Sequence, residues 1–316
     1  MLNRRYLRVK VLQALYAFFQ TEGADLPRGE KEMLKSIEKI YDLYLYMLLL
    51  VIDVWGAGQK QIEQNKEKRL PSEEDLNPNT RFVDNRVIRI LADNHELLKV
   101  FDQKKLTWHP EFENVRKLFR SIRDSDEYER YMGQPDSSFE IDRNFVVDIF
   151  RKYIGQFELA HHYLEEKSIY WADDLGLVAL QIIKSLQAVK PTDNINSSLL
   201  PDLYKDRNED VQFVKDLFRK TIIHSDEYGA LISGHTKNWD MERIAKLDVI
   251  LMKMAVCEFS QFSSIPVKVS LNEYIELSKS YSTPKSKVFI NGVLDKLVAQ
   301  MKRSGDIVKR GRGLIE

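Results

Sequence analysis

Apolar residues recur every three or four positions along almost the whole chain, and this spacing constrains the fold more than any other feature of the sequence. The pattern is typical of amphipathic helices, whereas alternating runs of β-branched residues, which would indicate strands, are few. The sequence therefore predicts an all-α fold. Helices are expected near residues 4–21, 30–53, 81–105, 111–131, 141–165, 171–189, 208–232, 240–262, 269–280 and 284–303.

The overall charge of the chain gives no argument for a nucleic-acid partner. Lys and Arg together number 48, and so do Asp and Glu, so any electrostatic attraction must come from local clusters. Basic residues gather at the start, where Arg4, Arg5 and Arg8 precede the first acidic residue, and again near the end, from Lys302 to Arg312. Either cluster could hold a ligand or could simply keep a terminus solvated.

The sequence lacks the short motifs that mark common enzymes. It has no glycine-rich phosphate loop, no Gly-x-Ser-x-Gly, no Cys-x-x-Cys and no His-Glu-x-x-His, so no catalytic residue, cofactor or metal is expected. His161 and Glu165 lie one helical turn apart, but the adjacent His161 and His162 point in different directions, which favours a solvated helix face over a metal site. The single cysteine, Cys257, lies in an apolar segment and is expected to pack as a small hydrophobe.

A cytoplasmic location is expected, because the N-terminus is charged and amphipathic rather than a signal peptide. The apolar run Leu43–Val54 is shorter than the roughly 20 residues that a membrane-spanning helix needs, so it predicts a buried helix and no membrane attachment.

Two groups of residues have a chemistry that suits RNA. Arg4 and Arg8 are four residues apart on one side of the first helix with Arg5 beside them, and guanidinium groups bind phosphates and stack on unpaired bases. The second group surrounds the start of the helix near 284–303, where backbone N–H groups and lysines attract phosphate and an aromatic ring can stack a base. It comprises Lys268, Lys285, Lys287 and Phe289.

That last helix contains residues that an ordinary core helix does not need. Asn291 and Gly292 both lower helix propensity, and Gly costs about 1 kcal/mol relative to Ala. One explanation is structural, with close helix packing at Gly292, a hydrogen-bonded Asn291 and Phe289 in the core. The other is that these residues serve a ligand.

The order of motifs in the C-terminal part resembles the NusB family of transcription antitermination factors. The segment Asp248-Val249-Ile250-Leu251-Met252-Lys253-Met254-Ala255-Val256-Cys257-Glu258, which corresponds to a family helix of the type Asp-x-x-x-Leu-x-x-Ala-x-x-Glu, comes first. It leads to Ile265-Pro266-x-Lys268-Val269-x-x-Asn272-Glu273-x-x-Glu276-Leu277-x-Lys279, and then to Phe289-x-Asn291-Gly292-Val293-Leu294-Asp295-Lys296. The start, with Arg4-Arg5-x-x-Arg8 and then Gln13-Ala14-Leu15-Tyr16, is similar to the arginine-rich first helix of that family. The resemblance covers roughly residues 3–22 and 208–300.

The resemblance implies a NusB-like helical bundle that binds RNA without catalysis. It implies a factor that binds boxA-like leader RNA together with NusE, a small-subunit ribosomal protein, within the RNA polymerase antitermination complex. The RNA contacts it implies are Arg4, Arg5, Arg8, Lys268, Lys285, Lys287, Phe289 and Asn291. Lys285 departs from the acidic residue that many relatives carry there, which leaves the base preference open.

Family members are roughly half as long as this chain, so the resemblance also implies an insertion. The expected parts are NusB-like helices with the arginine-rich start at 1–59, a helical insertion at 60–200, and a NusB-like domain with a basic tail at 201–316. Two alternatives remain. The inserted helices could make the chain a scaffold that has lost RNA binding, or it could be related to the front domain of ribosomal RNA methyltransferases, although no strand–helix alternation follows residue 300.

The insertion could itself be a degenerate copy of the C-terminal part. Asp148-Ile149-Phe150-Arg151-Lys152 recurs 68 residues later as Asp216-Leu217-Phe218-Arg219-Lys220, and Trp171 recurs as Trp239. A second, competing sequence similarity pairs residues 118–128 with residues 217–228. Amphipathic helices also reuse similar residues without common descent, so both explanations stay open.

Overall fold

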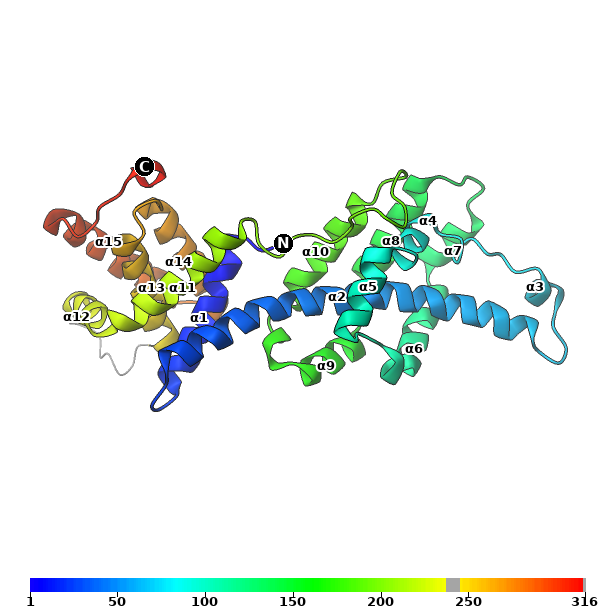
Figure 1. Ribbon diagram of the computed structural model, residues 1–316, viewed down its shortest axis with the longest axis horizontal. Coiled ribbons are helices and arrows are strands. Elements are labelled where there is room, and N and C mark those ends of the chain that lie inside the picture. The colour runs from blue at the N-terminus through cyan, green and yellow to red at the C-terminus, as the bar shows by residue number, and fades with distance from the viewer. Residues whose placement is uncertain (237–244, 315–316) are drawn as a thin grey trace. The chain divides into compact units, whose positions relative to one another are not determined.

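The structure is a computed structural model that describes residues 1–236 and 245–314, except for the side chains of residues 312 and 313. The described residues form α-helices joined by loops and short 3-10 turns, with no strand among them, which confirms the all-α prediction (Figure 1). The α-helices are α1 (Arg4–Gln20), α2 (Leu26–Lys66), α3 (Glu73–Leu76), α4 (Arg86–Ala92), α5 (His95–Lys104), α6 (Phe112–Arg123), α7 (Asp126–Gly133), α8 (Phe139–Lys152), α9 (Glu158–Lys167), α10 (Leu175–Ala188), α11 (Arg207–Ile223), α12 (Ser225–His235), α13 (Lys246–Gln261), α14 (Val267–Tyr281) and α15 (Ser286–Ser304). The 3-10 turns are η1 (His109–Glu111), η2 (Ile154–Gln156), η3 (Ile169–Trp171) and η5 (Gly311–Leu314).

Contacts divide the chain into two compact units. The terminal unit comprises Met1–Ile37 and Leu203–Glu316, and the central unit comprises Glu38–Asp202. α2 contributes its first turns to the terminal unit and the rest of its length to the central unit. The predicted boundary between residues 59 and 60 therefore falls within one continuous helix.

The core of the terminal unit is built around α13. This helix packs against α1, α11, α12, α14 and α15, and Figure 1 shows α1, in blue, beside α11 and α13. Every residue from Ile250 to Phe259 except Lys253 is buried, as expected for a helix that is apolar all round. Glu258 is the charged residue in this buried stretch, and a carboxylate in such a place needs partners that offset its lost hydration.

Two glycines in α2 allow aromatic rings to approach its backbone. A Cβ on Gly29 would lie 2.9 Å from the ring of Phe218, and one on Gly58 would lie 2.7 Å from the ring of Phe82 and 3.1 Å from that of Phe119. Packed carbon atoms do not come this close, so a larger residue at either position would displace the rings. In the central unit, Gly58 thereby lets α6, which carries Phe119, pack closely on α2.

Capping residues divide several helices that the sequence predicts as continuous. The helix expected over 81–105 is two helices, because the Asn94 side chain accepts a hydrogen bond from the N–H of Leu97 and starts α5. Ser125 likewise accepts from the N–H of Tyr128 and starts α7 within the expected helix 111–131.

The helices expected over 141–165 and 208–232 are also divided, into α8 with α9 and α11 with α12. Apolar spacing continues across such breaks and does not reveal them. The expected start of the helix 240–262 lies outside the described residues, and α13 begins at Lys246.

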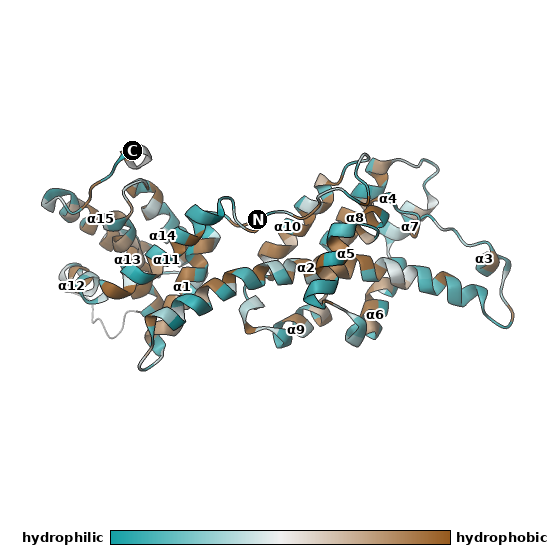
Figure 2. Cartoon of the chain, viewed as in Figure 1, coloured by the Kyte–Doolittle hydropathy of each residue, from teal (hydrophilic) through white to brown (hydrophobic). Residues whose placement is uncertain are grey.

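The apolar run in α2 forms a buried helix, as predicted. Within Leu43–Val54, all but three residues are buried. By length and composition, α2 is the one helix in the described part of the chain that could cross a membrane. However, 67% of its most apolar stretch is buried inside the protein, which is also typical of a core helix. Figure 2 shows hydrophilic residues over its last turns.

The two segments that could be copies each contribute a buried aromatic ring to their own unit. Phe150 of α8 and Phe218 of α11 are both fully buried, and Trp171 is buried with its indole N–H donating to the carbonyl of Lys39 at 2.7 Å. Trp239, the proposed counterpart of Trp171, lies outside the described residues. Buried aromatic residues result from common descent and from independent helix packing alike, so the duplication stays a hypothesis.

Candidate nucleic-acid interface

The first helix begins where the sequence predicts. The side chain of Asn3 accepts hydrogen bonds from the N–H groups of Arg5 and Tyr6 at 3.0 and 3.1 Å and so caps α1. The three arginines that follow point toward three different helices. Arg4 pairs with α11, Arg5 with α14 and Arg8 with α13, so each of them fixes α1 to another part of the terminal unit.

Arg8 forms a buried ion pair with Glu258. Its Nε and Nη2 donate to the two carboxylate oxygens at 2.9 and 2.6 Å, and the two side chains are 3% and 0% exposed. Ser270 and Tyr274 also donate their hydroxyl hydrogens to Glu258, at 2.6 and 3.0 Å. Burial opposes the charge on Arg8, but the Glu258 carboxylate outweighs it and the pKa of Arg8 is raised. In this arrangement Arg8 has no access to a ligand at the surface, contrary to the expected RNA contact.

Arg4 and Arg5 lie nearer to solvent. Arg4 donates to Asp210 at 2.7 Å, and its guanidinium stacks over the ring of Phe213, 4.4 Å from the ring centre. Arg5 makes a two-pronged pair with Glu273 at 2.9 and 2.8 Å, yet 49% of its side chain is exposed. The hydrogen bond from Arg5 lowers the pKa of Glu273 and keeps that carboxylate charged.

The predicted lysines gather at the starts of α14 and α15. Lys268 is exposed in the first turn of α14, and Lys285 and Lys287 are exposed at the start of α15. Pro266 and Lys285 occupy the N-cap positions of these helices, and neither provides a side-chain cap. Uncapped N–H groups next to lysines make both helix starts favourable for phosphate.

The motif residues of α15 show which structural explanation holds. The side chain of Asn291 donates to Asp295 at 3.1 Å, so the expected hydrogen bond is confirmed. The expectation of close helix packing at Gly292 is wrong, because this residue is exposed and an added Cβ would meet nothing within 4 Å. Phe289 is half-buried, between the fully buried Ile290 and the exposed Val288. Packing therefore does not explain the glycine.

The fold brings Arg5 of α1 and Lys287 of α15 within electrostatic range of the same carboxylate, Glu276 of α14. The pKa of Glu276 on α14 is lowered, mainly by its hydrogen bond from Lys279 and also by the positive charges of Arg5 and Lys287. Glu276 therefore lies within electrostatic range of both predicted clusters. Asn272 is exposed one turn after Lys268 on the same helix face, and the sequence-based assignment missed it although it is part of the quoted motif.

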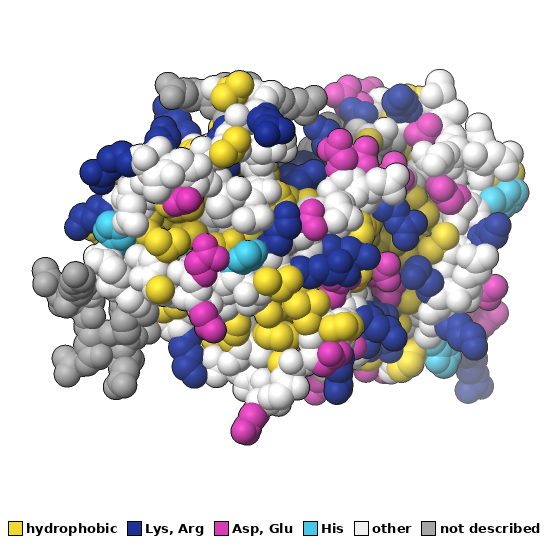
Figure 3. All heavy atoms as spheres, turned by 60° about the vertical axis from the view of Figure 1, so that its left-hand side comes forward, with side chains coloured by type: hydrophobic (Ala, Val, Ile, Leu, Met, Phe, Trp, Pro, Cys, Tyr) yellow, Lys and Arg dark blue, Asp and Glu magenta, His cyan; other side chains and the backbone are white. Residues whose placement is uncertain are grey.

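Acidic and basic side chains are interspersed on the face shown in Figure 3, so no single field dominates it. The basic C-terminal cluster also has structural contacts. The ammonium of Lys309 donates to the carbonyls of Glu258 and Phe262 at 3.1 and 2.8 Å, which satisfies the end of α13. Burial lowers the pKa of Lys309 to about 8. The side chain of Arg312 lies outside the described residues.

His161, His162 and Cys257 have structural contacts of their own. Within the described residues, no group of three or more His, Cys, Asp or Glu side chains could hold a metal ion. His161 contacts the carbonyl of Gly155 at 3.1 Å, and His162 pairs with Glu166 at the surface. Cys257 is buried, as predicted, and burial raises the pKa of its thiol to about 12, so it is not a reactive thiolate.

Comparisons with known proteins agree with the motifs. The family model described as "NusB family" matches residues 177–299. The transcription antitermination protein NusB of Salinibacter ruber is 38% identical over 139 residues, which cover 43% of this chain and 87% of that protein. The proteins of the same name from Chloroherpeton thalassium and Finegoldia magna are 31% and 38% identical over 140 and 95 residues, which cover 44% and 30% of this chain and 66% and 69% of those proteins. The family match includes the lysines of α14 and α15 but not α1.

Proposed function

The chain belongs to the NusB family, and on this premise we propose that it is a transcription antitermination factor that binds a single-stranded, boxA-like RNA. The proposal involves binding alone and no catalysis. The observation that carries it is the pair of uncapped helix starts at α14 and α15, where exposed lysines lie within the residues that match the family.

In this proposal the lysines and the helix starts bind the RNA backbone. Lys268, Lys285 and Lys287 neutralise phosphates, and backbone N–H groups of the first turns donate to phosphate oxygens. The exposed edge of Phe289 stacks on an unpaired base. The open space around Gly292 lets the RNA approach the α15 backbone where a side chain would block it.

The arginines of α1 have separate roles. Arg8 positions α1 against α13 through Glu258 and does not touch RNA. Arg5 is the arginine best placed for RNA, because its side chain is the most exposed of the three and its guanidinium can contact a phosphate from the solvent side while Glu273 keeps Arg8 as a neighbour. Arg4 is a weaker candidate because it also stacks on Phe213.

We also infer protein partners and a location from family membership. A small-subunit ribosomal protein of the NusE type would bind together with the RNA and link it to RNA polymerase in the cytoplasm. The surface proposed for this partner is the exposed side of α11 and α12 together with the exposed ends of α13. The contact residues within that surface are not assigned.

The test compares two triple variants that remove the same charge. Lys268, Lys285 and Lys287 are replaced by Ala in one, and the exposed Lys31, Lys296 and Lys302 in the other. Binding of a fluorescent boxA-like RNA and of a scrambled RNA is measured by anisotropy across salt concentrations, with and without the ribosomal partner. The first variant should lose boxA affinity and reduce the slope of log affinity against log salt by about 2, since each single-strand phosphate contact contributes about 0.7.

The control variant should keep most of its affinity and its selectivity for the boxA-like RNA. Equal losses in the two triple variants would show that the helix starts are not the RNA site. Absence of any preference for the boxA-like sequence, with the partner present, would count against the proposed function as a whole.

A further inference from the structure

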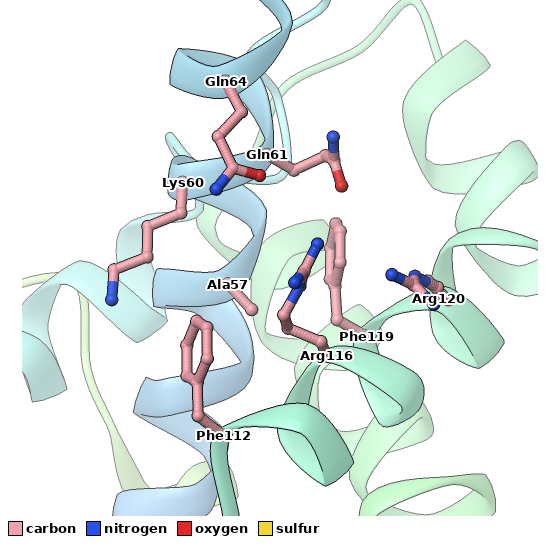
Figure 4. Close-up of a pocket in the computed structure, with 8 residues that line it drawn as sticks. All are labelled: Ala57, Lys60, Gln61, Gln64, Phe112, Arg116, Phe119 and Arg120. Atoms are coloured by element: carbon pink, nitrogen blue, oxygen red, sulfur yellow. The ribbon is translucent and has the colours of Figure 1, made fainter. Parts of the chain in front are cut away.

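The central unit contains a small hollow between the last turns of α2 and α6 (Figure 4). α2 contributes Lys60 and the amides of Gln61 and Gln64, and α6 contributes Arg116 and Arg120. The hollow is lined by Ala57, Lys60, Gln61, Gln64, Phe112, Arg116, Phe119 and Arg120. Its lining therefore holds three cationic side chains, two amides and no carboxylate.

The sequence builds this hollow by helical spacing on both sides. Lys60 and Gln64 are four residues apart on α2, and Arg116 and Arg120 are four residues apart on α6, so each pair lies along one helix face. Phe119 is buried between them and is held close to α2 because Gly58 has no side chain. Figure 4 shows Arg116 extending from α6 toward α2, below the two amides.

The cations of this hollow are poorly neutralised. Among the described residues, no carboxylate lies within ion-pair distance of Lys60 or Arg120, and the Lys60 ammonium lies 4.5 Å from the centre of the Phe112 ring. Arg116 pairs with Glu113 at 3.2 Å, but Glu113 is 72% exposed, and such a pair contributes about 0–1 kcal/mol.

Asp53 is a half-buried acid on the same helix as Lys60. Burial raises its pKa to about 6, and the charge of Lys60 acts in the opposite direction. The exposed Glu63 and Glu67 belong to the same part of α2 but do not line the hollow. The positive charge of the hollow is thus available to a ligand.

Three other hollows in the described part of the chain have acidic side chains in their lining. One pairs Lys152 with Glu158, a second includes Asp93 beside two arginines, and a third includes Asp124 and Glu129 beside Arg123. Each has an internal counter-charge. The α2/α6 hollow does not, so its excess positive charge points to an anionic partner.

We propose that the cations at the rim of the α2/α6 hollow, whose interior of about 10 Å³ has room for only one water, bind the backbone of single-stranded RNA as a second contact, which rests on the function proposed above. The arginines and Lys60 would bind phosphates, with the forked guanidinium groups suited to two oxygens at once. Gln61 already donates one N–H to Asn65 at 2.9 Å and keeps its oxygen as an acceptor. Together with Gln64 it offers donors and acceptors to ribose hydroxyl groups, which an acidic peptide lacks.

The test uses two RNAs and the full chain. One RNA contains only the boxA-like element, and the other carries the same element with unstructured flanking nucleotides. If the hollow binds RNA, the longer RNA should bind about tenfold more tightly, because the second contact is made within the same complex. The variant with Lys60, Arg116 and Arg120 replaced by Ala should lose this gain and bind the short RNA as the wild type does.

A matched control replaces the exposed Lys99, Lys184 and Lys190 by Ala, which removes the same charge from the central unit and should preserve the gain. Circular dichroism checks that each variant is folded. The proposal is overturned if the wild type does not bind the longer RNA more tightly than the short one. It is also overturned if the variant at Lys60, Arg116 and Arg120 still binds the longer RNA more tightly. A poly-glutamate peptide that binds these residues while RNA length has no effect would overturn it as well.

Failure of the two proposals can be distinguished. If the short RNA does not bind and the long RNA binds in a manner that depends on the hollow, the site on α14 and α15 fails and this inference stands. If the short RNA binds through Lys268, Lys285 and Lys287 and length adds nothing, the proposed function stands and this inference fails.

Discussion

Replacing Glu258 by Gln should lower the free energy of unfolding of the terminal unit by about 3–5 kcal/mol, the usual cost of breaking a buried ion pair. The carboxylate is 0% exposed and accepts four hydrogen bonds, two from Arg8 and one each from Ser270 and Tyr274. Gln has the same shape but no charge, so the buried Arg8 would lose its hydrogen-bonded counter-ion and keep only Glu273, 3.8 Å away. One acceptor oxygen would also become an NH₂ group that faces donors.

Hydrogen exchange measured by mass spectrometry suits this variant, because a chain with two units need not unfold in a single transition. The protected amides of α1, α13 and α14 should exchange faster by roughly two to three orders of magnitude. Amides of the central unit should keep their wild-type rates. A calorimetric scan should show a lower melting temperature for the transition of the terminal unit.

Glu273 provides the comparison, because it makes the same two-pronged kind of pair with Arg5, which is 49% exposed. Glu273 is itself 17% exposed and lies 3.8 Å from Arg8, so Glu273→Gln should cost more than the roughly 0–1 kcal/mol of a surface pair but less than Glu258→Gln. The reasoning assigns the difference between the two variants to burial. It would be refuted if Glu258→Gln proved no more destabilising than Glu273→Gln.

Three further substitutions test other features. Gly58→Ala should lower the melting temperature of the central unit, since its Cβ would lie 2.7 Å from Phe82 and cost about 1–3 kcal/mol; an unchanged calorimetric scan would contradict this. Gly292→Ala should stabilise the terminal unit by about 0.5–1 kcal/mol in urea while weakening RNA binding, and tighter binding would exclude a close RNA approach there. Burial raises the pKa of Asp53 from 3.8 to about 6, so the folded state binds more protons than the unfolded state and stability falls as pH rises through this window. Asp53→Asn should remove this pH dependence, which amounts to at most about 2–3 kcal/mol of unfolding free energy, so the melting temperature of the variant should change less between pH 4 and 7 than that of the wild type. Parallel pH profiles of the two proteins would argue against the raised pKa of Asp53.

Local patterns predicted much of the fold. The all-α class, the buried run in α2 and the burial of Cys257 follow from apolar residues at helical spacing, which act within one or two turns of chain. The divided helices were missed because Asn94 and Ser125 keep the surrounding spacing intact while their side chains cap new helices. A cap is visible in the sequence only as one polar residue among many.

The candidate site was predicted only in part. Lys268, Lys285 and Lys287 are exposed at helix starts, as the motif indicated, and Asn272 follows from the same motif once its exposure is known. The cationic hollow of the central unit could not be predicted, because it needs α2 and α6 side by side although their contributing residues are at least 48 positions apart in the chain.

The arginines of α1 show where sequence ends and tertiary structure begins. By itself, the sequence determined that Arg5 and Arg8 would lie near the start of one amphipathic helix. Only the folded structure decided that Arg8 is buried against Glu258, 250 residues away, while Arg5 stays half exposed against Glu273. The physical reason is that helical spacing sets the direction of a side chain, whereas its hydration and its partner depend on which distant helices pack around it.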